Sequence, residues 1–368
     1  MARVAVNGVH LNVEVWPSSP SPPAPLSLSV GEGESPVEVA ASVSSPDVQR
    51  EGLGGGVAGL NTAGRLSSPA HGRAGWAAGS AEPGDQSAWD GGEGLLLLHG
   101  FTGGVDAWRS HRPVLARRGA VVAVDLIGHG DSDAPDDPAR YSMDRCVEDL
   151  LTLLDHLGIP RVAVLGYSMG ARVALRLAVA APGRVAALIL ESGSPGLATQ
   201  GERQARRAAN EALAERIERE GVERFVDYWE SIPLFATQQR LPSAVREGQR
   251  RQRLRNNALG LANSLRGMGT GAQESLWDSL EAVTAPTLLM AGALDEKFRA
   301  IGRAMAAVMP DARLAIVPDA GHAVHLEQPG EFGQVVAGFL GRSATDVAWQ
   351  TTATDVASEP ATTASVSR

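Results

Sequence analysis

Six short and almost continuous apolar runs recur along the chain, and they constrain its fold more than any other feature. They occupy residues 94–99, 121–125, 162–166, 187–191, 287–292 and 313–317. Runs of this length and continuity are typical of strands that are buried on both faces of a parallel sheet. Because parallel strands need crossover connections, and helical patterns lie between the runs, we predict a doubly wound α/β fold.

Helical patterns separate these runs. Residues 142–157 place apolar side chains at helical spacing, and Ser142 can cap the first turn. Further helices are expected over residues 169–181 and 301–309. Residues 199–283 differ, because they are helical and highly charged and carry no strand signal. We therefore predict that a helical cap is inserted there into the alternating α/β pattern.

An Asn7-Gly8 pair lies between two short apolar runs at residues 3–6 and 10–16. Asn-Gly favours the tight turn of a two-residue hairpin, and Pro17 would end the second strand. We predict that this N-terminal antiparallel hairpin joins the mostly parallel sheet.

Residues 17–94 have the composition of a segment that does not pack. Gly, Pro, Ser and Ala fill 48 of its 78 positions, and no apolar periodicity runs through it. Such a segment buries too little apolar surface to offset the entropy of ordering it, so we predict a disordered insertion, either a spacer or a partner-binding segment. The tail over residues 343–368 has a similar composition and the same interpretation. Residues 1–16 and 95–342 then form one catalytic domain, with its cap at about 199–283.

Composition and charge exclude several classes of protein. The longest apolar run, residues 95–98, is far too short to span a bilayer, and the N-terminus lacks the apolar stretch of a signal peptide. We therefore expect no membrane insertion and a cytoplasmic location. The lone Cys146 excludes an intramolecular disulfide and a cysteine-based zinc cluster. A net charge of −9 makes nucleic acid a poor partner, and oligomeric state has no signal in the sequence.

The segment Gly166-Tyr167-Ser168-Met169-Gly170 has the G-x-S-x-G pattern, directly after a predicted buried strand and directly before a predicted helix. This context is the one that a nucleophile elbow requires, because small residues let the chain turn sharply and expose the serine Oγ. The helix N-terminus adds free N–H groups and a positive dipole end. We predict that Ser168 is catalytic; the alternative is a turn with only a structural role.

A catalytic serine needs a histidine base and an acid that orients the base. His322 lies in a loop just past the last predicted strand, and Asp295 lies just past the strand at residues 287–292. The order Ser168, Asp295, His322 is the order of the triad in α/β-hydrolases. Asp295 could instead be a helix N-cap or the partner of Lys297, and His322 an ordinary loop histidine.

Four of the seven other histidines bear on the same choice. His99 and His129 lie in loops at strand ends. We interpret His111 and His325 as ordinary, partly exposed residues.

An oxyanion hole requires two backbone N–H groups that point to one place. The elbow supplies the N–H of Met169, and the loop His99–Gly103 supplies that of Phe101. Gly100 would let this loop approach the serine closely.

Residues 95–341 are similar to the α/β-hydrolase fold, and within it the chain resembles the 2-succinyl-6-hydroxy-2,4-cyclohexadiene-1-carboxylate synthases of menaquinone biosynthesis. Arg172 is the most telling match, because the position four residues after the nucleophile is usually small or apolar in esterases of this fold. Ala171 departs from the more common second glycine but is still small. The matching motifs are Gly166–Arg172, Glu191–Leu197, Asp227-Tyr228-Trp229, Arg255-Asn256-Asn257 and Gly267–Gly271.

The resemblance implies a lyase reaction. Enzymes of this family eliminate pyruvate from a succinylated enolpyruvyl cyclohexene that carries three carboxylates, with no metal and no organic cofactor. Ser168, activated by His322 and Asp295, would then act as the base rather than as an acyl nucleophile. The oxyanion hole would hold the developing enolate of the succinyl ketone.

The resemblance also implies how the tricarboxylate substrate is bound. Arg172 lies one helical turn past the serine, where a guanidinium can bind a carboxylate bidentately. By the family pattern, Arg206 and Arg255 are further carboxylate clamps and Trp229 is a wall of the pocket. These cap residues could instead form surface salt bridges or an aromatic core. Tyr167 either donates its hydroxyl to the substrate or packs beside it.

Two alternatives remain open at this point. A carboxylesterase or carbon–carbon bond hydrolase of the same fold would use Ser168 as an acyl nucleophile, and fold alone does not separate it from the lyase. A ligand-binding module without catalysis would keep the pocket, but it would have no need for an intact Ser–His–Asp set.

Overall fold

The computed structural model describes residues 1–16, 94–116 and 119–341. The insertion predicted over residues 17–94 therefore lies outside the described residues except for Gly94, and the tail predicted over 343–368 lies outside them entirely.

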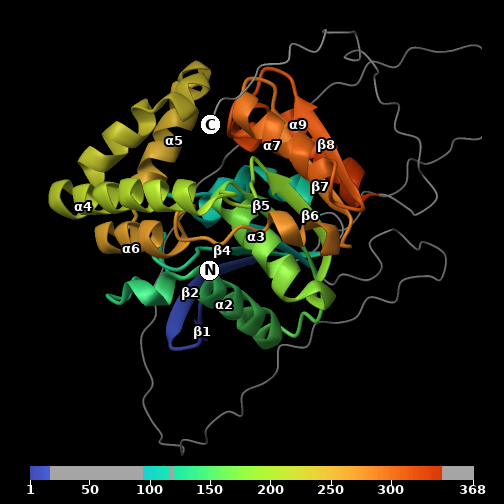
Figure 1. The fold of residues 1–368 in the computed structure, drawn as a ribbon, viewed down its shortest axis with the longest axis horizontal. Helices are drawn as coiled ribbons and strands as arrows, with labels where there is room; N and C mark the ends of the chain where they lie inside the picture. The colour runs from blue at the N-terminus through green and yellow to red at the C-terminus, as the bar shows by residue number, and fades with distance from the viewer. Residues whose placement is uncertain (17–93, 117–118, 342–368) are drawn as a thin grey trace, which may run out of the picture. The chain divides into compact units, whose positions relative to one another are not determined.

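A single eight-stranded sheet in the order β1-β2-β4-β3-β5-β6-β7-β8 runs through the described chain (Figure 1). Each of the six predicted apolar runs forms a strand whose ends lie within two residues of the expected ones, and the predicted fold class is confirmed. The strands are β1 (Ala2–Val6), β2 (Val9–Trp16), β3 (Gly94–Leu98), β4 (Ala120–Val124), β5 (Val162–Tyr167), β6 (Val185–Glu191), β7 (Thr287–Gly292) and β8 (Ala312–Val317).

The first two strands form the predicted hairpin. Asn7 and Gly8 take φ values of 45° and 84°, as a two-residue turn with two left-handed positions requires. Strand β2 then pairs antiparallel with β4, and all pairs from β4 through β8 are parallel. The hairpin is thus the antiparallel edge of a mostly parallel sheet.

Helices cover both faces of the sheet, and the side chains of β3 alternate between the two cores. Leu96 and Leu98 pack into the core beneath α2 (Met143–His156), α3 (Met169–Ala180) and α7 (Glu296–Ala306). Leu95 and Leu97 pack into the opposite core, with residues from α1 (Arg112–Leu115), α8 (Val324–Glu327) and α9 (Pro329–Leu340). A strand that is buried on both faces explains why its sequence is apolar without alternation.

One helix begins earlier than predicted. The expectation was a helix over residues 301–309, but α7 begins at Glu296. Asp295 is its N-cap, and its side chain accepts a hydrogen bond from the N–H of Phe298 at 3.2 Å. The capping interaction extends the helix over a first turn whose charged residues carry little apolar periodicity.

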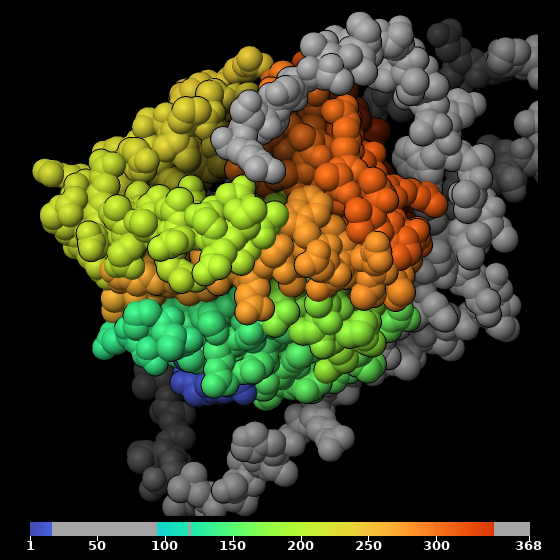
Figure 2. Space-filling view, in the orientation of Figure 1, coloured from blue at the N-terminus to red at the C-terminus, as the bar shows by residue number. Residues whose placement is uncertain are grey.

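Between β6 and β7 the chain forms α4 (Gln200–Ser231), α5 (Ser243–Leu254) and α6 (Ala258–Met268). A separate apolar cluster holds α4 to α6, with Ile217, Phe225 and Leu261 fully buried. Figure 2 shows α4 and α5 adjacent on the surface, in yellow-green to gold. Short 3-10 turns link the remaining elements, at Val105–His111, Pro138–Tyr141, Pro182–Arg184, Pro233–Arg240 and Trp277–Ala282. Within the described ranges, no helix combines the length and apolarity of a membrane span.

Candidate active site

Ser168 lies between the end of β5 and the start of α3, in a strained backbone conformation. Its φ is 51°, a left-handed value that is uncommon for a residue other than glycine. The flanking glycines make the turn possible: a Cβ on Gly166 would collide with the carbonyl of Gly170, and one on Gly170 with that of Leu98. The N–H of Ser168 donates to the carbonyl oxygen of Glu191 at 2.9 Å, which fixes the turn to β6.

The structure brings Ser168, His322 and Asp295 together. His322 Nε2 lies 3.0 Å from Ser168 Oγ, and His322 Nδ1 lies 2.8 Å from Asp295 Oδ2. Both His322 and Asp295 are buried. A carboxylate on Nδ1 favours the tautomer that carries its proton there, which leaves Nε2 free to accept the proton of the serine hydroxyl. Asp295 also caps α7, so the same side chain is both a helix N-cap and the partner of His322.

The two predicted oxyanion donors follow the ends of adjacent strands, because Leu98 of β3 pairs with Gly166 of β5. Neither the N–H of Phe101 nor that of Met169 has a hydrogen-bond acceptor among the described residues. Two backbone N–H groups that are free of acceptors, on the segments that flank the serine, are the donors that an oxyanion hole requires.

A row of aromatic rings runs from the loop His99–Gly103, here called the oxyanion loop, to His322. Phe101, Trp229 and Phe235 form this row, here called the aromatic wall. The ring of Trp229 lies 5.4 Å from Phe101 and 5.6 Å from Phe235, and Phe235 lies 6.1 Å from His322, all between centroids. The indole Nε1 of Trp229 is buried and has no partner within the described chain. Trp229 thus lies against the loop that carries Phe101, and it presents an unused donor.

Tyr167 packs between two histidines. Its ring centroid lies 5.5 Å from that of His322 and 4.7 Å from that of His325. Burial, reinforced by the carboxylate of Glu191, raises the pKa of the Tyr167 phenol well above its ordinary value. Its hydroxyl therefore stays protonated at neutral pH.

Arg172 is a buried cation without a carboxylate partner in the described part of the chain. Its Nη1 donates to the carbonyl oxygen of Met268 at 2.6 Å and to Gln273 Oε1 at 2.8 Å. Burial and the nearby guanidinium of Arg206 lower the pKa of Arg172 to about 10, so it is charged at neutral pH. Arg206 is exposed, and no ion pair joins it to another described residue. Gln273 Nε2 is a further buried donor without a partner within the same ranges, and sequence reasoning missed it.

Arg255 does not have the surroundings that the resemblance implied. Its Nη1 lies 2.8 Å from Asp106 Oδ2 and its Nη2 lies 2.6 Å from Asp131 Oδ2, at a surface position. Because carboxylates of the chain itself already occupy this guanidinium, its assignment as a substrate clamp is corrected.

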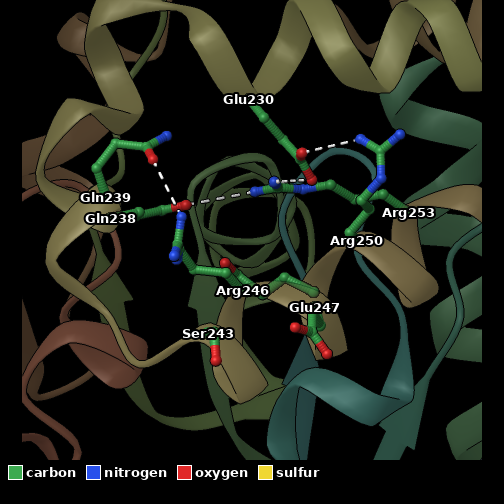
Figure 3. A pocket seen from close by; sticks show the side chains of 9 residues that line it. Glu230, Gln238, Gln239, Ser243, Arg246, Glu247, Arg250 and Arg253 are labelled. Atoms are coloured by element: carbon green, nitrogen blue, oxygen red, sulfur yellow. Dashed lines mark hydrogen bonds and ion pairs between the residues drawn. The ribbon is translucent and has the colours of Figure 1, made fainter.

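Arg253, two residues earlier, was not singled out in the sequence and lies nearer to the aromatic wall. It is buried, stands 5.4 Å above the ring of Phe235 and pairs with Glu230 at 3.0 Å. With Gln238 and Arg246 it lines a cavity of about 320 Å³ between the end of α4, the turn at 233–240 and α5 (Figure 3).

His111 and His325 are buried, not partly exposed as the sequence suggested. His325 donates its backbone N–H to Glu191 Oε1 at 3.0 Å, and its Nδ1 lies 2.9 Å from the same oxygen. Burial lowers the pKa of His111 to about 4. In the sequence, Glu191 could have indicated this burial, because an acidic residue that ends an otherwise apolar strand needs a buried partner.

Within the described residues, no group of three His, Cys, Asp or Glu side chains is arranged to hold a metal ion.

Sequence comparison gives two findings. Residues 94–329 match the family described as the alpha/beta hydrolase fold. A Bacillus subtilis (strain 168) protein, provisionally named 2-succinyl-6-hydroxy-2,4-cyclohexadiene-1-carboxylate synthase, is 48% identical over 248 residues, which cover 67% of this chain and 90% of that protein.

Solved structures with the same fold carry different names. MenH from S. aureus superposes with a TM-score of 0.66 at 34% identity, covering 68% of this chain and 94% of that chain. A thermophilic esterase from Thermogutta terrifontis gives a TM-score of 0.60 at 30% identity, covering 68% of this chain and 90% of its own. Fold similarity by itself therefore does not select the reaction.

Proposed function

Because the chain belongs to the α/β-hydrolase fold family, and within it to the 2-succinyl-6-hydroxy-2,4-cyclohexadiene-1-carboxylate synthases, we propose that it is a lyase of menaquinone biosynthesis. It eliminates pyruvate from 2-succinyl-5-enolpyruvyl-6-hydroxy-3-cyclohexene-1-carboxylate. One observation supports this beyond family membership: Arg172, whose backbone N–H donates to the carbonyl oxygen of Ser168, lies close enough to Arg206 for the two cations to repel each other, and no ion pair joins either to a described carboxylate. Such a pair favours a substrate that brings its own carboxylates.

The reaction begins with Ser168 as the base. Its Oγ removes the ring proton beside the succinyl ketone, and His322 accepts the serine proton through Nε2. The electron pair moves through the ring double bond as the carbon–oxygen bond to the enolpyruvyl group breaks. The enolate of pyruvate leaves and takes up a proton that the His322 imidazolium gives back, which yields pyruvate and restores the neutral histidine. Asp295 holds the imidazole in position and stabilises the imidazolium. The N–H groups of Phe101 and Met169 stabilise the enolate oxygen while it carries charge.

Substrate carboxylates bind to the cations that the chain leaves unpaired. Arg172 and Arg206 form one clamp, and Gln273 adds its free amide N–H. Trp229 forms the wall and donates from Nε1, and the neutral hydroxyl of Tyr167 is available beside it. The proposed substrate is a small, soluble pathway intermediate, so we place the reaction in the cytoplasm; neither nucleic acid nor a cofactor has a part in it.

The second candidate is an esterase or carbon–carbon bond hydrolase that forms an acyl-enzyme at Ser168. Its support is the similarity to the Thermogutta terrifontis esterase. The uncompensated Arg172 argues against it, because an uncharged ester offers nothing to a buried guanidinium.

Pyruvate release from the enolpyruvyl substrate, followed in a coupled assay, tests the proposal. We expect rapid release by the wild-type protein and none by Ser168→Ala, with an unchanged circular dichroism spectrum. Turnover of p-nitrophenyl acetate should be slow by comparison. Ester hydrolysis at a high rate without pyruvate release would establish the hydrolase, and pyruvate release by Ser168→Ala would remove the serine from the mechanism.

A further inference from the structure

The oxyanion loop contains a strained residue. Thr102 follows Phe101 directly and has a φ of 66°, in the left-handed region. For a β-branched residue this conformation is a genuine outlier, and it persists only where the surrounding structure holds it. Thr102 is buried, and the turn around it is closed by a hydrogen bond from the N–H of Gly103 to the carbonyl oxygen of Gly100 at 2.9 Å.

The side chain of Asn256 holds this loop from the opposite side. Asn256 lies in the junction between α5 and α6, and it is 5% exposed. Its Nδ2 donates to the carbonyl oxygen of Thr102 at 2.9 Å, and its Oδ1 accepts from the N–H of Gly130 at 3.0 Å. One amide thus fastens the loop after β3 and the loop after β4 to the inserted helices.

Arg255 reinforces the same junction at the surface. Its two carboxylate partners lie beside the contacts of Asn256: Asp106 is in the 3-10 turn that follows the Thr102 loop, and Asp131 is next to Gly130. Arg255 is 43% exposed, so solvent screens these pairs and they contribute little individually. The buried amide of Asn256 is the more consequential contact, because losing its bond would leave a polar group unpaired in the interior.

We propose that Asn256 is a positioning residue for the oxyanion hole. By fixing Thr102 in its left-handed conformation, it aims the N–H of Phe101 at the position where negative charge develops beside Ser168. Docking of the inserted helices is then a condition for a complete oxyanion hole. The inference rests on the proposed roles of Ser168 and Phe101, but it applies whichever reaction Ser168 carries out.

The decisive variant is Asn256→Asp. It keeps the shape of the side chain and the acceptor for Gly130, but it places a carboxylate oxygen against the carbonyls of Thr102 and of Arg253, to which Nδ2 also donates at 3.0 Å. Loss of a whole oxyanion donor costs about 10²–10³ in kcat. For a misaimed donor we expect kcat for pyruvate release to fall about 10–100-fold, with KM changed less than about threefold.

Asn257→Asp is the matched control. Asn257 is the N-cap of α6, where its side chain accepts from the N–H of Gly260 at 3.0 Å. Aspartate caps a helix as well as asparagine does, so this neighbouring change of equal charge should leave kcat unaltered. If Asn256→Asp does not fold, Asn256→Ser takes its place, since a short neutral side chain cannot reach both loops.

A second substitution separates positioning from general stability. Glycine adopts the left-handed region without strain, so Thr102→Gly combined with Asn256→Asp should recover most of the kcat that Asn256→Asp loses. The rate at which a fluorophosphonate labels Ser168 reports the oxyanion hole without the natural substrate, and it should fall and recover in parallel.

Wild-type kcat and labelling in a folded Asn256→Asp protein would overturn the inference, as would a loss of kcat that Thr102→Gly does not recover. A wild-type protein that labels at Ser168 but releases no pyruvate would instead overturn the proposed function. In that case the labelling rates still decide the role of Asn256.

Discussion

At the scale of single residues, Arg172 carries the proposed specificity. Removing its charge by Arg172→Gln should lower kcat/KM for the tricarboxylate substrate about 30–1,000-fold, the equivalent of about 2–4 kcal/mol for a buried charged contact. Because its pKa is lowered to about 10, the guanidinium is charged below that pH, and clamping should weaken only as the pH rises through about 10. Steady-state kinetics of pyruvate release measure both effects.

Arg176→Gln provides the control on the same helix. Arg176 pairs with the largely exposed Asp144 at the surface, so its loss should leave kcat/KM nearly unchanged. If Arg172→Gln behaves like Arg176→Gln, the clamp assignment is wrong.

The sequence located the candidate site residues that directly follow a strand. It did not locate the candidate site residues whose neighbours come from distant segments of the chain. The positions of Ser168, Asp295 and His322 follow from the strands that precede them. Arg253 and Arg255 are two residues apart at the end of α5, where neighbours at that spacing point to different sides. Motif matching selected Arg255, which contacts Asp106, because the local sequence does not show which of the two arginines faces the cavity.

At the scale of the elements, the strands were predictable because continuous burial leaves a continuous apolar signature. The break in α4 was not. Residues 200–231 have helical, charged composition throughout, yet Gly221 takes φ 81° and ψ 170°, which interrupts the helix before the segment that carries Trp229. The sequence around a single glycine in a helical pattern does not show whether the helix continues through that glycine or breaks there.

This break leads to a prediction for Gly221→Ala. The conformation of Gly221 is essentially restricted to glycine, so alanine should lower the free energy of unfolding by about 1–3 kcal/mol, although no atom lies within contact distance of the added methyl group. Gly201→Ala, in the first turn of the same helix and equally open, should be neutral or stabilising. Urea unfolding measures both, and equal stability of the two variants would contradict the proposed strain.

At the scale of the whole molecule, buried neutral histidines should make stability sensitive to mild acid. His99 Nδ1 lies 2.7 Å from the carbonyl oxygen of Gly100, and Nε2 accepts from the N–H of Leu126, so the pattern needs a neutral ring. Burial lowers the pKa of His99 to about 4, and burial lowers that of His129 to about 3.

The sign of the effect follows from where the protons bind. The unfolded chain takes up these protons near pH 6.5 and the folded chain does not, so stability is lost as the pH falls below 6.5. Between pH 7 and pH 5 each of the two histidines should lower the free energy of unfolding by about 2 kcal/mol. Urea unfolding at the two pH values tests this, and a constant free energy of unfolding would show that the two rings take up protons in the folded protein as readily as in the unfolded chain.

The strand pairing also predicts that the catalytic domain can fold without residues 17–93. Trp16 of β2 pairs with Val121, and Gly94 of β3 pairs with Ala120, so the two ends of the segment flank the start of β4. They lie two strand spacings apart, about 10 Å, which four extended residues can span.

We expect that a six-residue Gly/Ser linker in place of residues 17–93 leaves kcat/KM for pyruvate release within about twofold of wild type. If the segment acts as a flexible loop, shortening it from 77 to six residues reduces the entropy of closure by about 2 kcal/mol, and stability to urea should rise by that amount. Lower stability in the shortened chain would mean that residues 17–93 contribute contacts to the catalytic domain, and the interpretation of this segment as an insertion would then fail.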